Sequence, residues 1–228
     1  MNDQNTPDER VLIVAPHALD EVLGCGGVAA LAAAAGRHVD VLVVFGDGRG
    51  HDARRRDSAQ AAADILGYGT PQYLGFPENR SDTLPLGELV SPIEDVLRET
   101  GARDVYVPFG NSLHGDHKKT YQAAVTAARP LPGSPVRSLL AYEILSSSDW
   151  APAVDGAFAP DSFVEITPVL AAKLDAIAAY DFEMREEPHA RSPQAVERLA
   201  RMRGSTVGFA AAEAFMTVRR RKPVGIHP

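Results

Sequence analysis

The chain has 228 residues, of which 45% are hydrophobic and 23% charged, and its formal net charge is -7. These values are typical of one soluble globular domain, and the acidic balance argues against a nucleic-acid-binding protein, which usually presents a basic face. No apolar run is long enough for a membrane span, and residues 1–9 lack the apolar core of a signal peptide. The single cysteine, Cys25, excludes an internal disulfide and an all-cysteine zinc site, so we expect a cytoplasmic protein.

The first half of the chain alternates short apolar runs with segments of helical periodicity. Apolar runs of this length are typical of buried strands, and glycines end most of the helical segments. The expected strands are 11–15, 39–45, 71–76 and 104–109. The expected helices are 21–35, 53–66, 87–100 and a segment that follows NSLHGDHKKT to about residue 128.

The second half continues the pattern. We expect strands at 137–145 and 162–166 and helices at 168–180 and 193–214. Strands that alternate with helices predict a three-layer, Rossmann-like α/β fold, in which a mostly parallel sheet carries helices on both faces. We expect a single domain over 10–218, a flexible tail at 1–9 and a basic tail at 219–228.

Two polar clusters follow predicted strands. His17 and Asp20 come after strand 11–15, and the sequence HGDH places His114, Asp116 and His117 after strand 104–109. If both strands are central and parallel, both clusters face the crevice at the carboxyl ends of the strands, where α/β proteins bind ligands. Two imidazoles and a carboxylate, with water in the open position, form a catalytic zinc shell. Other divalent metals suit the same ligands.

Two other interpretations use the same stretches. The histidines and aspartates could form a structural hydrogen-bonded network, and spacing alone does not choose between this and a metal site. The glycines of GCGG, at 24–27, could indicate a dinucleotide-binding oxidoreductase. That fingerprint opens the helix directly after the strand, whereas Gly24 lies nine residues beyond Ala15. Close packing of a helix on the sheet explains these glycines better.

Several segments together resemble the PIG-L/LmbE-type zinc N-deacetylases. The opening PHALDEVLGCGG is similar to that family's His-Pro-Asp-Asp-Glu motif followed by Gly-x-Gly-Gly, and HGDH is a complete His-x-Asp-His motif. Further similarity lies, in order, in RRRDSAQAAADILG, YLGF, AYEIL and RGSTVGFAAAEAF. The resemblance therefore spans nearly the whole chain.

The resemblance implies roles for individual residues. It implies zinc, or another divalent metal, bound by His17, Asp20 and His117. It places His114 at the oxyanion of the tetrahedral intermediate and makes Asp116 a carboxylate that orients a neighbouring histidine. A substrate-contacting arginine falls on Arg56, with Arg55 an equally good alignment.

The sequence departs from the family at the expected general base. The first aspartate of the motif is replaced by Leu19, which cannot accept a proton. Loss of general-base help typically costs a factor of about 100 to 10,000 in rate. Another carboxylate could serve, either Asp47 in the GDG loop or Glu143, which we also expect at the substrate. Otherwise a metal hydroxide acts with His114 alone, or the chain no longer hydrolyses amides.

The expected function is metal-dependent removal of an N-acetyl group from an amino sugar or a glycoconjugate. The resemblance also makes a homo-oligomer an expectation, with a small N-acetylated sugar as the partner molecule and neither nucleic acid nor a membrane span involved. The alternative is a catalytically inactive relative that binds a metal or a sugar, and Leu19 is the residue that favours it.

Overall fold

A computed structural model of the chain describes residues 10–46 and 51–222. The strands are β1 Val11–Ala15, β2 Val39–Phe45, β3 Gln72–Phe76, β4 Asp104–Pro108, β5 Ser138–Tyr142, β6 Ser162–Glu165 and β7 Ala212–Arg220. The α-helices are α1 Asp20–Ala34, α2 His51–Leu66, α3 Leu86–Thr100, α4 Gly115–Ala127, α5 Leu170–Ala178 and α6 Pro193–Ser205.

The strands form one seven-stranded sheet in the order β3-β2-β1-β4-β5-β7-β6. β1 pairs in parallel with both β2 and β4, β3 extends the parallel part beyond β2, and β5 extends it beyond β4. β7 runs antiparallel to both of its neighbours, β5 and β6. The prediction of a mostly parallel sheet is therefore confirmed.

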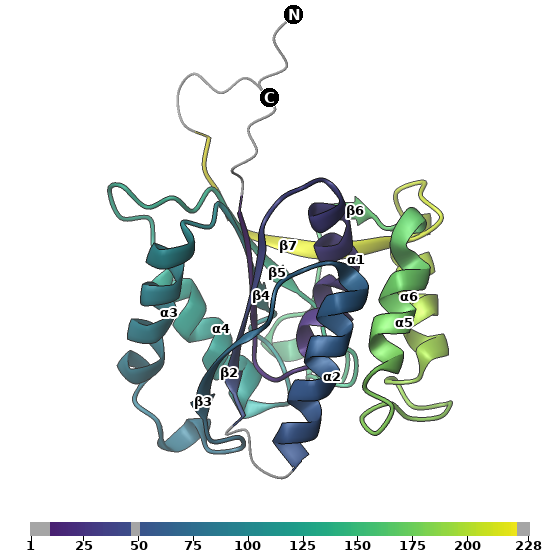
Figure 1. Cartoon of the computed structure of the whole chain (residues 1–228), viewed down its shortest axis with the longest axis horizontal. Helices are drawn as coiled ribbons and strands as arrows, with labels where there is room; N and C mark the ends of the chain where they lie inside the picture. Colours follow the sequence, from purple (N-terminus) through teal and green to yellow (C-terminus); the bar gives the residue numbers. More distant parts are fainter. Residues whose placement is uncertain (1–9, 47–50, 223–228) are drawn as a thin grey trace, which may run out of the picture.

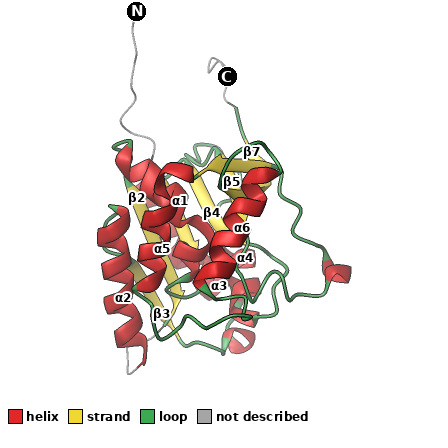
Figure 2. Ribbon diagram, turned by 90° about the vertical axis from the view of Figure 1, so that its right-hand side faces the viewer, coloured by secondary structure: helices red, strands yellow, loops and turns green. Residues whose placement is uncertain are grey.

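Helices cover both faces of the sheet, as predicted (Figure 1). Alternate residues of a strand point to opposite faces, and on β1 both sets are buried: Val11 and Ile13 pack in the core under α1, α2 and α5, and Leu12 and Val14 pack in the core under α3 and α4. Figure 2 shows α1, α2, α5 and α6 together over one face. Burial on both faces explains why the parallel strands read as continuous apolar runs.

The prediction of a helix over 193–214 is wrong in its last part. α6 ends at Ser205, and the chain turns through Gly208, whose φ of 84° suits glycine, before it enters β7. The alanine-rich sequence AAAEAF resembles a helix by composition, but Ala212 and Ala214 pair with β6, and β7 pairs with β5 from Phe215 onward. β7 extends to Arg220 and so includes the first two residues of the expected basic tail.

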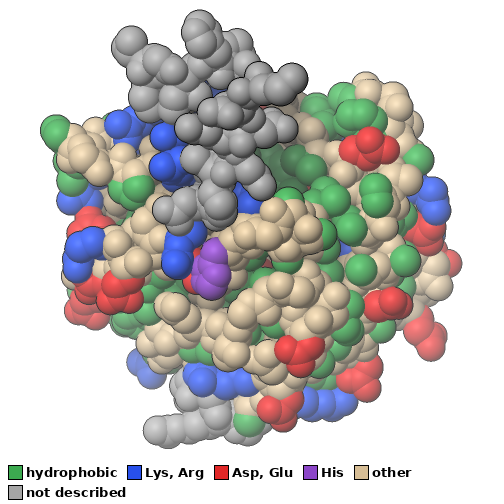
Figure 3. All heavy atoms as spheres, turned by 45° about the horizontal axis from the view of Figure 1, so that its top comes forward, with side chains coloured by type: hydrophobic (Ala, Val, Ile, Leu, Met, Phe, Trp, Pro, Cys, Tyr) green, Lys and Arg blue, Asp and Glu red, His purple; other side chains and the backbone are tan. Residues whose placement is uncertain are grey.

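The basic side chains near the amino ends of the parallel strands have structural partners. Arg37 pairs with Asp104 at 2.5 Å, and Arg221 donates to the carbonyls of Ser134 and Val136. On the face turned forward in Figure 3, Lys and Arg side chains gather beside the residues drawn in grey, and Asp and Glu lie towards the margins. Within the part of the chain that the structure covers, no helix is long and apolar enough to cross a membrane.

The glycines of α1 allow the helix to lie directly on the sheet, as expected. A Cβ on Gly24 would lie 2.1 Å from the ring of Tyr142, and one on Gly27 would lie 2.5 Å from the side chain of Ile166. Both separations are far shorter than van der Waals contact. Because Asp20 begins the same helix, this close packing also fixes the height at which Asp20 stands above the end of β1.

A buried ion pair enters the backbone of α1 beside these glycines. The carboxylate of Glu213 accepts hydrogen bonds from the amides of Gly27, at 2.7 Å, and Val28, at 2.8 Å. Lys173 pairs with Glu213 at 2.6 Å and donates to the carbonyl of Leu23 at 2.8 Å. Glu213 and Lys173 thus satisfy backbone groups in the middle of the helix, and they join α1 to α5 and β7.

We expect a Glu213→Gln variant to lower the free energy of unfolding by about 3 kcal/mol, because removing one partner leaves Lys173 as an uncompensated buried charge. The glutamine side chain also has one acceptor oxygen where glutamate has two, so it cannot replace both hydrogen bonds to the backbone amides of Gly27 and Val28. Urea unfolding measures the change. Glu165→Gln, at an exposed position on the adjacent strand β6, is the matched control. Equal stability of the two variants would contradict a stabilising role for the pair.

Candidate metal centre

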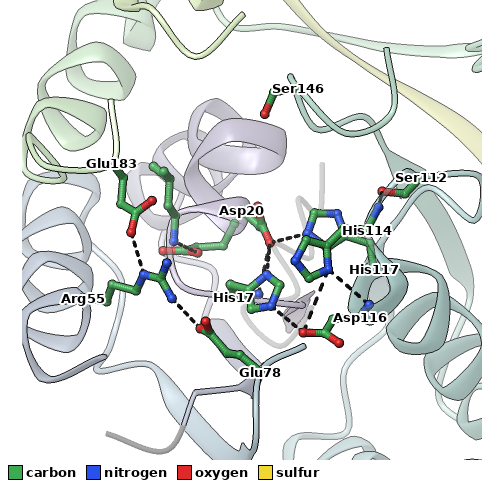
Figure 4. A network of polar contacts seen from close by, with 12 residues as sticks. His17, Asp20, Arg55, Glu78, Ser112, His114, Asp116, His117, Ser146 and Glu183 are labelled. Atoms are coloured by element: carbon green, nitrogen blue, oxygen red, sulfur yellow. Dashed lines mark hydrogen bonds and ion pairs between the residues drawn. The ribbon is translucent and has the colours of Figure 1, made fainter. Parts of the chain in front are cut away.

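The two polar clusters meet at the point where the strand order reverses. β1 and β4 are neighbours in the sheet, and the chain continues from β1 outward to β2 and from β4 outward to β5. The crevice beyond the carboxyl ends of two such strands is where open α/β sheets bind ligands. The loop after β1 carries His17, and the loop after β4 carries His114. The expectation that both loops face one crevice is confirmed (Figure 4).

The loop after β1 is a tight turn. The amide of His17 donates to the carboxylate of Asp20 at 3.1 Å, and Leu19, between them, has a φ of 96°. The amide of Leu19 donates to Glu21 at 2.9 Å, and the hydroxyl of Tyr180 donates to the other oxygen of Glu21 at 2.7 Å. The buried Glu21 carboxyl therefore holds the turn in the shape that brings His17 over Asp20.

The loop after β4 leads into α4 with His114 as the residue that caps the helix. Nδ1 of His114 accepts a hydrogen bond from the amide of Asp116 at 3.2 Å. Asp116 and His117 then lie in the first turn of α4, and each is 1% exposed. A histidine as the cap sets the direction of its ring, because one ring nitrogen is committed to the helix.

The first candidate ligand set is His17, Asp20 and His117. Oδ2 of Asp20 lies 3.4 Å from Nδ1 of His17 and 3.3 Å from Nε2 of His117. Ligand atoms about 3.3–3.4 Å apart form the edges of a tetrahedron whose metal-ligand bonds are about 2.0–2.1 Å long, which are the distances zinc prefers. The spacing and the mixture of two imidazoles with one carboxylate therefore fit a divalent metal ion.

Asp116 completes a second set around His17. Its Oδ2 lies 3.0 Å from Nε2 of His17 and accepts the amide of Asn79 at 2.8 Å. His17, His114 and Asp116 also bring ligand atoms close together. An outer carboxylate that orients a ligand histidine is common at metal sites, and the histidine that Asp116 contacts in this way is His17. The other oxygen of Asp116, Oδ1, has no hydrogen-bond partner among the described residues.

The cluster holds its histidines in different protonation states. Burial alone would disfavour the charged form of His17, but hydrogen bonds to Asp116 and Asp20 raise its pKa to about 9. Burial outweighs the attraction of Asp20 and lowers the pKa of His117 to about 4. Burial and the charge of His17 lower the pKa of His114. At neutral pH in the metal-free protein, His17 is therefore charged, and His114 and His117 are neutral.

We expect the zinc affinity of the metal-free protein to rise about tenfold per pH unit between pH 7 and 8.5. A metal ligand must be deprotonated, and with a pKa of about 9 His17 is still protonated in this range. A histidine with an ordinary pKa of about 6.5 would give an almost flat profile there. A competition titration against a chromophoric chelator measures the slope.

Asp116→Asn is the variant that tests the cause, because it weakens the hydrogen bond that raises the pKa of His17. The slope of this variant should be shallower than that of the wild type. A wild-type affinity that does not change with pH would show that His17 is not the protonated ligand.

A pocket of about 160 Å³ opens over the first ligand set. Arg55 lies along one side of it, donating from Nε to Glu183 at 2.8 Å and from Nη1 to Glu78 (Figure 4). Arg191 also lines the pocket, 3.8 Å from Glu183. No sequence motif singles out Glu183 or Arg191. Glu78 could have been suggested, because it stands in the loop that follows β3.

The structure does not bring all of the expected site residues together. Of the two aligned arginines, Arg55 lines the pocket, whereas Arg56 stacks on the ring of Tyr73 at 4.0 Å. Glu143 does not line the pocket but is held by Arg203 through two hydrogen bonds, at 2.8 and 2.6 Å. Asp47 lies outside the described residues.

Comparisons with known proteins place this site in context. The Escherichia coli K12 protein "Uncharacterized deacetylase YaiS" is 29% identical over 144 residues, which cover 60% of this chain and 75% of YaiS. The N,N'-diacetylchitobiose deacetylase from Pyrococcus horikoshii has a similar structure, with a TM-score of 0.75 at 21% identity, covering 92% of this chain and 84% of its own.

A third relative shows that the fold alone does not fix the reaction. GalB from Pseudomonas putida KT2440, a 4-carboxy-2-hydroxymuconate hydratase, matches with a TM-score of 0.74 at 22% identity, over 96% of this chain and 100% of its own. The model of the family described as PIG-L: GlcNAc-PI de-N-acetylase matches residues 12–128, slightly more than half of the chain, a span that includes both histidine clusters. The chain therefore belongs to the PIG-L family.

Proposed function

We propose that this protein is a metal-dependent hydrolase that removes an N-acetyl group from an amino sugar or a glycoconjugate. The observation that carries the proposal is the convergence of His17, Asp20 and His117 in one pocket at the reversal point of the sheet. Membership of the PIG-L family and the deacetylase names of the relatives support the choice of reaction.

The metal would be zinc, held by His17, Asp20 and His117, with Asp116 orienting His17. When bound, a divalent metal would polarise the amide carbonyl and make water a better nucleophile at neutral pH. Three protein ligands would leave a position for substrate and water, as in catalytic rather than structural zinc sites, and all three line the pocket.

His114 would stabilise the charge that develops on the carbonyl oxygen. Its Nδ1 accepts from the amide of Asp116, so in the neutral ring the proton is on Nε2, the nitrogen that remains for substrate. Burial lowers the pKa of His114 and keeps the ring neutral at pH 7. The side chain is 32% exposed and lines the pocket, which supports a role as a fixed donor to the developing oxyanion.

The general base must come from elsewhere than position 19. Apart from the ligand Asp20, the carboxylates of the described residues that line the pocket are Glu78 and Glu183. Glu183 lies between two cations, Arg55 and Arg191, whereas Glu78 contacts only Arg55 among the ion pairs of the described residues. We therefore assign the base role to Glu78. It would take a proton from water as the water oxygen bonds to the acetyl carbon, and it would return that proton to the nitrogen as the C–N bond breaks.

We expect Glu78→Gln to lower kcat about tenfold, which is less than the factor of about 100 that marks the low end of general-base catalysis. The effect is small because one oxygen of the carboxylate already accepts a hydrogen bond from Arg55 and is not free for the water. The measurement is zinc-dependent acetate release from a panel of N-acetylated sugars and their conjugates. Glu183→Gln is the matched control, and a larger fall in kcat there would reassign the base.

The alternative is a relative that binds a metal or a sugar without turnover. Leu19 is the observation that favours it, because the position that supplies the family's base is here a buried apolar side chain that is 2% exposed. Tight zinc binding together with no acetate release from any substrate of the panel would support this alternative.

A further inference from the structure

A second cavity adjoins the metal pocket. It has a volume of about 340 Å³, and it shares His114, Glu183 and Arg191 with the smaller pocket over the metal ligands. A substrate whose acetamide group lies against His114 would therefore place the next part of the molecule in this second cavity. We call it the Trp150 pocket, after the aromatic residue in its wall.

Trp150 offers an aromatic surface to the ligand. It is the only tryptophan of the chain, and its side chain is 51% exposed. Its ring packs edge to face against that of His189, with 5.3 Å between the ring centroids. The loop that carries it is fastened, because Asn111 donates to the carbonyls of Pro152 and Gly156 at 2.9 and 2.8 Å. An exposed but fixed aromatic ring beside a catalytic pocket suits stacking against the apolar face of a sugar.

The Trp150 pocket is also lined by two positively charged side chains, Arg185 and Arg191. The guanidinium of Arg185 donates to the carbonyls of Phe182 and Met184, and among the described residues no carboxylate forms an ion pair with it. Arg191 donates to the hydroxyl of Ser146 at 2.6 Å and lies 3.8 Å from Glu183.

The one carboxylate that lines this pocket does not balance these charges. Glu183 already accepts a hydrogen bond from Arg55 at 2.8 Å. The pocket is therefore lined by two guanidinium groups, those of Arg185 and Arg191, and by one carboxylate, that of Glu183. Glu183 also pairs with a third guanidinium, that of Arg55. Arg191 is also held in place by its hydrogen bond to Ser146, whose φ of 66° lies in the region that non-glycine residues rarely adopt.

We propose that the Trp150 pocket binds a negatively charged substituent of the substrate, so that the protein acts on acidic N-acetylated sugar derivatives in preference to neutral ones. The inference rests on the proposed deacetylase function and names its substrate class. The sugar stacks on Trp150, and Arg185 and Arg191 bind the anionic group, which is a phosphate or a carboxylate. Guanidinium groups pair well with either anion.

Three substrates of the same sugar separate charge from shape: the methyl glycoside of N-acetylglucosamine, its carboxymethyl glycoside and N-acetylglucosamine 1-phosphate. We expect kcat/KM for at least one anionic substrate to exceed that for the methyl glycoside about tenfold, the gain of one charge-assisted hydrogen bond. The carboxymethyl and phosphate arms show which anion is preferred. Arg185→Gln should bring the ratio close to one, whereas Arg201→Gln, at an exposed residue of α6, should keep it.

Equal kcat/KM for all three substrates, unchanged in Arg185→Gln, would overturn the inference while leaving the deacetylase intact. If no substrate releases acetate, the proposed function fails instead. Calorimetric titration with N-acetylglucosamine 1-phosphate then tests whether the Trp150 pocket binds an anion. Binding by the wild type that weakens about tenfold in Arg185→Gln would support the anion site. Absence of binding would overturn it.

Discussion

A His117→Ala variant is expected to lose its zinc and to release acetate at least about 1,000-fold more slowly than the wild type. His117 supplies one of three ligand atoms of the first set, and its removal leaves only His17 and Asp20. Metal polarisation of a carbonyl contributes several kcal/mol to a transition state, and each 1.36 kcal/mol corresponds to about a factor of ten in rate. Acetate release and metal content by atomic absorption measure the two effects.

Two controls make this result specific. His38→Ala removes an exposed histidine just before β2, whose side chain pairs with Asp40, and should leave both zinc content and rate unchanged. Thermal unfolding with and without zinc supplies a readout apart from activity, since a ligand that binds only the folded state raises its stability. Zinc should raise the Tm of the wild type but not that of His117→Ala. Retained zinc in His117→Ala would point to the second set, His17, His114 and Asp116.

The sequence was sufficient for the parallel part of the fold and for the place of the site. Strands buried on both faces appear as unbroken apolar runs such as VDVLVVF, so β1, β2 and β4 could be located to within a residue. The two clusters were expected at one edge because each follows a parallel strand. Sequence order alone could not reveal that β1 and β4 are neighbours, and this adjacency is what brings His17 next to His117.

The sequence failed where long-range packing decides the local structure. Residues 212–220 form a strand because the first part pairs with β6 and the second part with β5, and no local pattern contains that information. Arg55 and Arg56 are adjacent in α2, so about 100° of helix rotation separates a pocket residue from one that stacks on Tyr73. Glu143 follows a central strand, yet Arg203 of α6 binds its carboxylate away from the metal ligands.

Glu183 and Arg191 were missed for a related reason. They belong to the segment between α5 and α6, which has no regular periodicity, and they reach the metal pocket only because that segment folds back across the crevice. Their contacts in the structure single them out: Glu183 accepts a hydrogen bond from Arg55, and Arg191 donates one to Ser146. Residues that a fold brings in from such connections carry no sequence signal unless they belong to a motif.

A Leu19→Asp variant is expected to release acetate about 100-fold faster than the wild type. General-base help is worth a factor of about 100 to 10,000, and we assign to Glu78 only about the first tenfold of it. Leu19 lines the metal pocket and directly precedes the candidate ligand Asp20, so a carboxylate there would face the water that would attack the substrate. The measurement is kcat for the best substrate of the panel, at saturating zinc.

The backbone at position 19 suits aspartate better than leucine. A φ of 96° is strained for leucine, whereas Asp and Asn enter positive φ several times more often than other residues. The substitution does sacrifice a buried apolar side chain that is 2% exposed, worth about 1.5–3 kcal/mol. We therefore expect a folded variant that is about 1–2 kcal/mol less stable than the wild type, because relief of about 1 kcal/mol of strain offsets part of the loss.

Leu19→Asn separates the base from the change of shape. Asparagine has the size and backbone preference of aspartate but cannot accept the proton. A gain in rate from relieved strain or from a larger pocket would therefore appear in both variants. A gain from proton transfer would appear in Leu19→Asp alone. Equal rates in the two variants would show that position 19 no longer limits turnover and that Glu78, or the metal ligands with His114, already supply all the help the site uses. A gain confined to Leu19→Asp would mean that one residue separates this chain from a fully active deacetylase. The candidate metal ligands, His114 and the turn after β1 would then have kept a working geometry around an apolar side chain.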